Sequence, residues 1–217
     1  MLDANMRNTV WLLLVFFSLA LGCNNSPAQP TPSHLEKLRA EISQSEKAAA
    51  KRPLPKLVIE LPTVAGWQHF EPKPLPIDDD GLSIAFEHED GITVTFYQYT
   101  RGMKTIPTGT STVTTTELQR ARNGIKEMIS LKLWDNAVEE ETEETSVGTS
   151  ELQAAWSRYQ LTKDQQELVS DIYVWGSRNR IFKVRATGDA TQLEAYEAAL
   201  QTLLTALGKA CVAVATK

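Results

Sequence analysis

The chain has 217 residues, of which 42% are hydrophobic and 23% are charged, a balance typical of a globular protein with enough apolar material for one core. Its 22 lysine and arginine residues are outnumbered by 27 aspartate and glutamate residues, which gives a net charge of −5. Proteins that bind the phosphate backbone usually carry a basic face, so this charge argues against nucleic acid as a partner.

The N-terminal segment has the pattern of an export signal. Residues 10–22 contain no charged side chain, and this run is shorter than the roughly 20 apolar residues that a membrane-spanning helix needs. Asp3 offsets Arg7, whereas a start at Met6 would leave the positive charge that signal peptides favour. We expect residues 1–22 to be a signal peptide, with Met6 as an alternative start.

The end of this run resembles the lipid-attachment signal of bacterial lipoproteins, through Ala20, Leu21, Gly22 and Cys23. The resemblance implies cleavage before Cys23 and acylation of its thiol, and two or more acyl chains hold a protein durably at a membrane. Asn24 stands where an aspartate would resemble the inner-membrane retention signal. In a bacterium with two membranes, this implies the outer membrane, facing the periplasm. An ordinary secretory signal that contains a cysteine is the alternative.

The sequence has one further cysteine, Cys211. With Cys23 acylated, a single thiol remains, so no disulfide within the chain is expected. If acylation fails, a Cys23–Cys211 disulfide is the competing interpretation.

A spacer and a helix are expected between the anchor and the body. Residues 23–33 hold prolines among polar residues, a composition that stays extended and forms no core, so we expect a proline-rich tether. Ser33 and Glu36 form a capping-box pattern at the start of a weakly amphipathic helix over residues 34–52. Its apolar stripe is narrow and consists of Leu35, Leu38 and Ile42.

We expect residues 53–217 to form a single domain. A short strand is predicted over residues 57–61, and two alternating runs within residues 81–100 predict a hairpin whose turn is Asp90-Gly91. The first core helix is then predicted from a second capping box, formed by Thr116 and Gln119.

The second half of this domain predicts four strands and a closing helix. The strands cover residues 137–145, 150–162, 167–175 and 180–187, and the last two are joined by a turn at residues 176–179. Asp189 is placed to cap a final helix that ends before Gly208. Runs of strands with separate helices predict an α+β fold, an antiparallel sheet flanked by helices.

This order of elements resembles the Mog1/PsbP-like fold. The likeness rests on "LPTVAGW", on "ITVTFYQYTRG" followed by "IPTG", and on "IFKVRATG" before the last helix. These stretches also resemble small exported bacterial proteins of unknown function. The resemblance implies an α/β/α sandwich and, since members of that fold are mostly binding or assembly factors, a non-catalytic role.

No metal site or cofactor is expected. The histidines are scattered without ligand spacing and are His34, His69 and His88. Asp78, Asp80, Gly81 and Glu87 fit four positions of a calcium-binding loop. A loop of that kind does not begin with proline or place serine at its eighth position, so a turn that enters a strand is favoured.

An acidic run follows the first core helix and consists of Glu139, Glu140, Glu141, Glu143 and Glu144. Such a run is typical of a solvated edge strand, and attraction of a cationic peptide or of divalent ions is the alternative. No GxSxG motif is present. An enzyme would therefore need a site assembled from scattered residues.

Alternation within the strands suggests one aromatic and cationic face of the sheet. Its candidate binding residues are Tyr97, Tyr99, Tyr173, Trp175, Lys183 and Arg185. Aromatic and basic residues are favoured at recognition surfaces. The alternative is that a helix covers this face and that the aromatic residues belong to the core.

Together these patterns predict a lipid-anchored protein of the cell envelope that acts as a non-catalytic binding or assembly module. Its expected contacts are the membrane, through lipid on Cys23, and an envelope protein or peptide. An envelope hydrolase is the alternative function.

Overall fold

The computed structural model describes residues 32–76, 80–147 and 149–213. Its centre is an eight-stranded antiparallel sheet with the order β1-β3-β4-β8-β7-β6-β5, and β2 pairs with β3 beside this path. The strands are β1 (Trp67–His69), β2 (Lys73–Pro74), β3 (Leu82–His88), β4 (Thr93–Tyr99), β5 (Asn136–Val147), β6 (Thr149–Lys163), β7 (Gln166–Ser177) and β8 (Arg180–Asp189).

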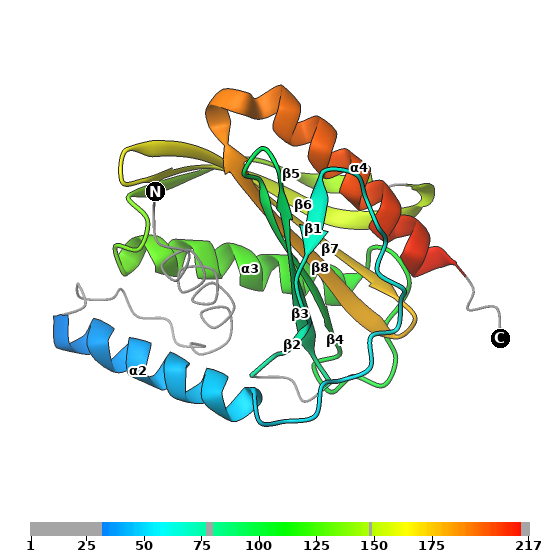
Figure 1. The fold of residues 1–217 in the computed structure, drawn as a ribbon, viewed down its shortest axis with the longest axis horizontal. Helices are drawn as coiled ribbons and strands as arrows, with labels where there is room; N and C mark the ends of the chain where they lie inside the picture. Colours follow the sequence, from blue (N-terminus) through cyan, green and yellow to red (C-terminus); the bar gives the residue numbers. More distant parts are fainter. Residues whose placement is uncertain (1–31, 77–79, 148, 214–217) are drawn as a thin grey trace.

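Helices α3 (Thr112–Ser130) and α4 (Leu193–Val212) lie on opposite sides of this sheet (Figure 1). On the α4 side, Leu203 and Leu207 pack in one buried cluster with Phe96. On the α3 side, Leu118 and Ile125 belong to a second cluster. The sheet is therefore buried on both faces, and the predicted α+β fold with an antiparallel sheet flanked by helices is confirmed.

Both predicted hairpins are confirmed. Gly91 has φ 78° in the turn between β3 and β4, a backbone conformation that glycine adopts without strain. Arg178 and Asn179, with φ of 50° and 55°, join β7 to β8. Positive φ at both central residues is the requirement of a type I′ turn, whose twist matches that of the flanking strands.

The strand predicted over residues 57–61 is wrong, because this segment has no strand. The buried side chain of Gln98 takes the place of a neighbouring strand: its Oε1 accepts a hydrogen bond from the Val58 N–H at 2.9 Å, and its Nε2 donates to the Lys56 carbonyl at 2.9 Å. Ile59 is buried in the α4-side cluster. The apolar pattern therefore predicted burial of this segment correctly. Its backbone is hydrogen-bonded to the Gln98 side chain and not to a neighbouring strand.

Helix α3 begins one turn before the capping box that Thr116 and Gln119 were expected to form. Ser111 is the N-cap, and it exchanges hydrogen bonds with Thr114: each side chain accepts from the other residue's backbone N–H. Threonine at N3 replaces the glutamate or glutamine of the usual capping box.

Helix α4 continues through Gly208 to Val212, so the predicted end before Gly208 is wrong. A Cβ built on Gly208 would lie 2.4 Å from the carbonyl oxygen of Val147. The glycine thus permits close packing of α4 on β5 instead of ending the helix. Cys211 consequently lies inside α4 and is buried. Asp189 caps a short 3-10 helix, Ala190–Gln192, that leads into α4.

Helix α2 (Pro32–Ala49) matches the helix expected over residues 34–52. The side chains of Leu35, Leu38 and Ile42 lie outside the described residues, as do the signal segment, Cys23 and the tether. Among the helices that the structure describes, none is long and apolar enough to cross a membrane.

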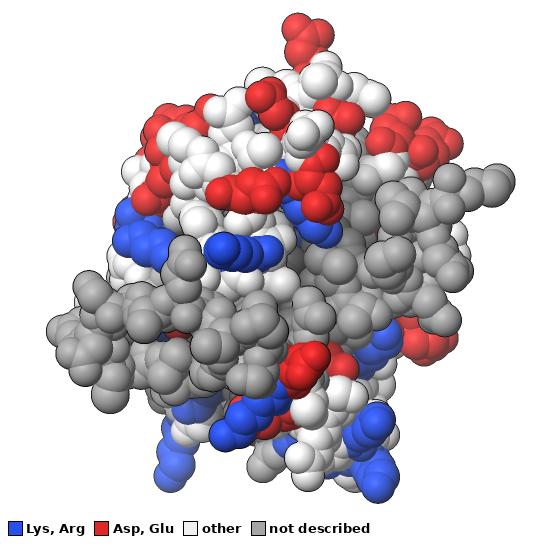
Figure 2. Space-filling model, turned by 90° about the vertical axis from the view of Figure 1, so that its left-hand side faces the viewer, with Lys and Arg blue, Asp and Glu red and all other residues white. Residues whose placement is uncertain are grey.

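The acidic run lies on β5, which forms one edge of the sheet, so the predicted acidic edge strand is confirmed. Glu140, Glu141, Glu143 and Glu144 are exposed. Figure 2 shows acidic side chains gathered over the upper part of one face of the molecule and basic side chains below them. The surface charge is therefore unevenly distributed.

Candidate binding site

Strand pairing places four of the six candidate residues on the α3 side of the sheet. Tyr97 of β4 lies opposite Lys183 of β8, and Arg185 lies two residues further along the same strand. Tyr97 and Tyr99 are buried in the α3-side cluster, so α3 covers this face and its aromatic residues belong to the core, as the alternative interpretation expected. Alternation along β4 and β8 therefore brings together Tyr97, Tyr99, Lys183 and Arg185, as the sequence predicted.

Tyr173 and Trp175 lie on the other side of the sheet, so the single face expected from the sequence is wrong. In β7 they pair with Val184 and Phe182 and join the α4-side cluster. Trp175 is 0% exposed. Paired residues on neighbouring strands share a side of the sheet, so the correct grouping needed the register between β7 and β8, which alternation within one strand does not contain.

Two cations on the α3 side lie against aromatic rings. The Lys183 Nζ lies 4.3 Å from the centre of the Tyr97 ring and 5.9 Å from that of Tyr99, and the Arg185 guanidinium carbon lies 4.7 Å from the centre of the Trp134 ring. Burial lowers the pKa of Lys183 to about 8 and that of Arg185 to about 10. Burial thus makes both cations costly, and the rings compensate only in part.

A buried carboxylate, Glu117 of α3, lies beside this pair. Arg101 donates to it at 2.9 Å, Arg120 forms a second ion pair, and the Tyr99 hydroxyl donates at 3.1 Å. Burial alone would raise the pKa of Glu117, but the hydrogen bonds and charges of the two arginines outweigh it and lower the pKa. Glu117 is therefore ionised and already has two cationic partners.

Glu139 forms another cluster between α3 and the edge of the sheet. Its carboxylate accepts hydrogen bonds from Thr142 and Ser157 at 2.7 Å, from Tyr159 at 3.0 Å and from Arg122 at 2.7 Å. Burial acts to raise its pKa, but these hydrogen bonds outweigh burial and lower the pKa to about 2. One member of the acidic run therefore has a packing role that its exposed neighbours lack.

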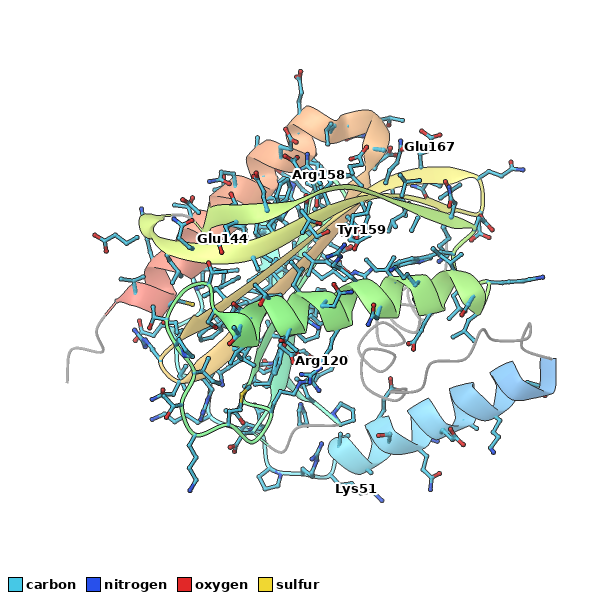
Figure 3. All side chains as sticks on the ribbon, turned by 180° about the vertical axis from the view of Figure 1, so that it is seen from behind. Lys51, Arg120, Glu144, Arg158, Tyr159 and Glu167 are labelled. Atoms are coloured by element: carbon cyan, nitrogen blue, oxygen red, sulfur yellow. The ribbon has the colours of Figure 1, made fainter. Side chains whose placement is uncertain are left out.

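The α4 side has its own ionic cluster, centred on Asp171. This carboxylate accepts from Trp156 at 2.9 Å, from Arg158 at 3.0 Å and from the Tyr196 hydroxyl at 2.8 Å, and Arg158 also pairs with Glu197 of α4. Figure 3 shows Arg158 directed from the sheet toward α4 and its neighbour Tyr159 directed toward α3. Because its hydrogen bonds are made to these neighbours, we interpret Asp171 as structural.

Sequence reasoning did not single out Glu117 or Asp171. Asp171 carried a recognisable signal, a lone carboxylate in the apolar strand run "VSDIYVW", since a charge inside a buried strand needs a partner. Glu117 carried a weaker signal: Arg120 lies three residues further along α3, but Arg101 comes from a loop 16 residues away.

The residues weighed for metal binding do not come together. Within the described ranges, no group of three His, Cys, Asp or Glu side chains could hold a metal ion. His88 lies against the Trp67 ring, and its Nδ1 is 3.3 Å from the Asp90 carboxylate. Glu87 is an exposed residue of β3, while Asp78 and the side chain of His34 lie outside the described residues.

The chain matches no protein-family model and no curated protein. Among solved structures it is similar to LpqN, described as involved in cell envelope biogenesis of Mycobacterium tuberculosis. The match has a TM-score of 0.38 and 13% sequence identity, and it covers 67% of this chain and 79% of the LpqN chain. We therefore draw no conclusion about the fold or function of this chain from the similarity to LpqN.

Proposed function

We propose that this chain is a lipid-anchored protein of the cell envelope that acts as a binding or assembly module. The observation that carries the proposal is Gly22-Cys23 at the junction between an uncharged apolar run and a proline-containing polar segment. An acylated cysteine at that position holds the chain on a membrane surface. In a bacterium with two membranes, Asn24 supports an outer-membrane location facing the periplasm.

The tether sets how the folded body is presented. Residues 23–31 are polar and contain two prolines, and α2 follows directly. Because a proline-containing polar segment stays extended, we expect it to keep the sheet and its helices clear of the bilayer surface. A body held in this way can meet ligands or proteins of the envelope while it remains attached.

The α3 side of the sheet supports a binding role. Lys183 and Arg185 lie there, packed against the buried rings of Tyr97 and Trp134, and basic side chains of this kind bind anionic groups. The resemblance to Mog1/PsbP-like domains points to the same class of function, because most members of that fold are binding or assembly factors. We propose the two cations Lys183 and Arg185, without the buried aromatic residues of the sheet, as the binding region.

Acylation of Cys23 is the first test. Bacteria that produce the chain are fed an alkyne analogue of palmitate, and the purified protein is examined for label. We expect label on the wild type and on Cys211→Ala, which removes the other cysteine, but none on Cys23→Ser. In fractionated cells, the wild type should sediment with membranes and Cys23→Ser should not.

Label on Cys23→Ser equal to that on the wild type would contradict the proposed anchor. Release of wild-type protein into the soluble fraction would contradict it as well. The Cys211→Ala control separates loss of the attachment site from a general effect of removing a thiol.

A further inference from the structure

We propose that Lys183 and Arg185 hold the anionic group of a ligand, of the phosphate class, on the α3 side of the sheet. This inference rests on the proposed binding role and names the chemistry that the binding region recognises. It is drawn from the hydrogen-bonding groups that the fold leaves unused at these two side chains.

Arg185 is the centre of the site. Its side chain extends from β8 and the residue is 8% exposed, yet Nε and Nη2 are buried atoms without a hydrogen-bond partner in the described part of the chain. These two nitrogens form one edge of the guanidinium group, the edge that binds two oxygens of one anion at once. An uncompensated buried charge is strongly unfavourable, so a vacant guanidinium edge points to a ligand anion.

Lys183 adds a second donor two residues away on the same side of β8. It is less buried than Arg185, and its Nζ lies over the ring of Tyr97. Residues two apart on one strand face the same side of the sheet, so the Lys183 and Arg185 side chains both lie on the α3 side. Lys183 therefore forms the solvent side of the site and Arg185 its deeper wall.

Two carboxylates on this side of the sheet, Glu117 and Glu139, have other cationic partners. Glu117 is bound by Arg101 and Arg120, and Glu139 by Arg122. No ion pair joins Lys183 or Arg185 to a carboxylate among the residues that the structure describes.

The number of donors favours phosphate over carboxylate. A carboxylate has two oxygens, and both would be used by the Nε and Nη2 edge of Arg185. A phosphate group has further oxygens that can accept from the Lys183 ammonium at the same time.

Two sources of the phosphate group are distinguished by titration. The acylated full-length product, purified in a non-ionic detergent, is titrated by calorimetry with sodium phosphate. In a second arm it is titrated with the same detergent micelles containing phosphatidylglycerol, and plain micelles are the blank. We expect heat of binding in at least one arm. Binding of sodium phosphate identifies a free anion as sufficient, whereas binding of phosphatidylglycerol alone identifies a lipid headgroup.

Methionine variants test the two residues. Arg185→Met and Lys183→Met keep most of the side-chain volume and remove the charge, and we expect each to weaken binding about tenfold or more. The control is Lys209→Met, which removes an exposed charge on α4, on the other side of the sheet, and should bind as the wild type does.

Melting temperatures without phosphate distinguish a binding role from a structural one. Because Arg185 has a buried, unpaired edge, Arg185→Met should melt at or above the wild-type temperature while it loses binding. A lower melting temperature with unchanged affinity in Lys183→Met would overturn the proposal. So would equal affinity in all variants or no binding in either arm. Because the titrated protein is acylated, an absence of phosphate binding would not contradict the proposed lipid anchor.

Discussion

At the scale of single residues, Glu139 shows how strongly local contacts change an acidic side chain. Its hydrogen bonds from Arg122, Thr142, Ser157 and Tyr159 hold the pKa near 2, below its ordinary value of 4.5. A carboxyl group with a lowered pKa in the folded state stabilises the protein at pH values above its unfolded pKa. This contribution is lost as the pH falls from about 4.5 toward 2.

We therefore predict a pH-dependent effect of Glu139→Gln. At pH 7 the variant should lose about 1–2 kcal/mol of unfolding free energy, a value reduced from the full pKa shift because solvent screens a partly exposed pair. Between pH 4.5 and pH 2 the wild-type advantage should disappear. Urea unfolding measured across this range checks the prediction.

Glu144→Gln is the control for that measurement, because Glu144 is an exposed residue of the same strand. It should differ from the wild type by a few tenths of a kcal/mol at most. A constant difference between wild type and Glu139→Gln from pH 7 to pH 2 would show that the hydrogen-bonded carboxylate is not the source of the effect.

At the scale of the element, α4 depends on a glycine inside the helix. Gly208 allows α4 to approach β5 so closely that a Cβ would lie 2.4 Å from the Val147 carbonyl oxygen. Glycine ordinarily weakens a helix by about 1 kcal/mol relative to alanine. Its presence here reflects packing between α4 and the sheet.

Gly208→Ala should therefore destabilise the protein, opposite to the usual effect of this change in a helix. We expect a loss of about 1–3 kcal/mol, because either the helix or the backbone at Val147 must shift. Chemical denaturation measures the loss. The control is Ala198→Gly at an exposed position of α4, which should cost about 1 kcal/mol through helix propensity alone.

Increased stability of Gly208→Ala would mean that α4 lies further from β5 than the structure has it.

At the scale of the whole molecule, the sheet with α3 and α4 forms the stable body, and α2 lies beside it (Figure 1). Among the side chains described in α2, Ala49 is the one that is buried. Arg52, just after this helix, donates a hydrogen bond to the Leu75 carbonyl. Among the described residues these contacts are few, so we expect them to contribute little to the free energy of unfolding.

A chain that begins at Pro53 should therefore fold on its own. We predict one cooperative thermal transition, within a few degrees of the transition of the chain that begins at Cys23. Scanning calorimetry compares the two chains. The longer one carries a replacement at Cys23, so that neither chain is acylated. A broad or non-cooperative transition in the shorter chain would show that α2 belongs to the core.

Local signals in the sequence were sufficient for most elements. Asp90-Gly91 identified the first hairpin, residues 176–179 the second, and the acidic run the edge strand β5. Each of these features depends on residues close together in the chain, where backbone preference and alternation act directly.

Tertiary structure decided which of those residues meet. Tyr173 and Trp175 were separated from Lys183 and Arg185 by the register between β7 and β8, although each strand alternates as predicted. The Gln98 side chain bonds to the backbone of Lys56 and Val58, where a strand over residues 57–61 was predicted. Helix α4 continues through Gly208, where it approaches the Val147 carbonyl closely. These outcomes depend on contacts between distant segments, whose geometry follows from how the sheet pairs and how the helices pack on it.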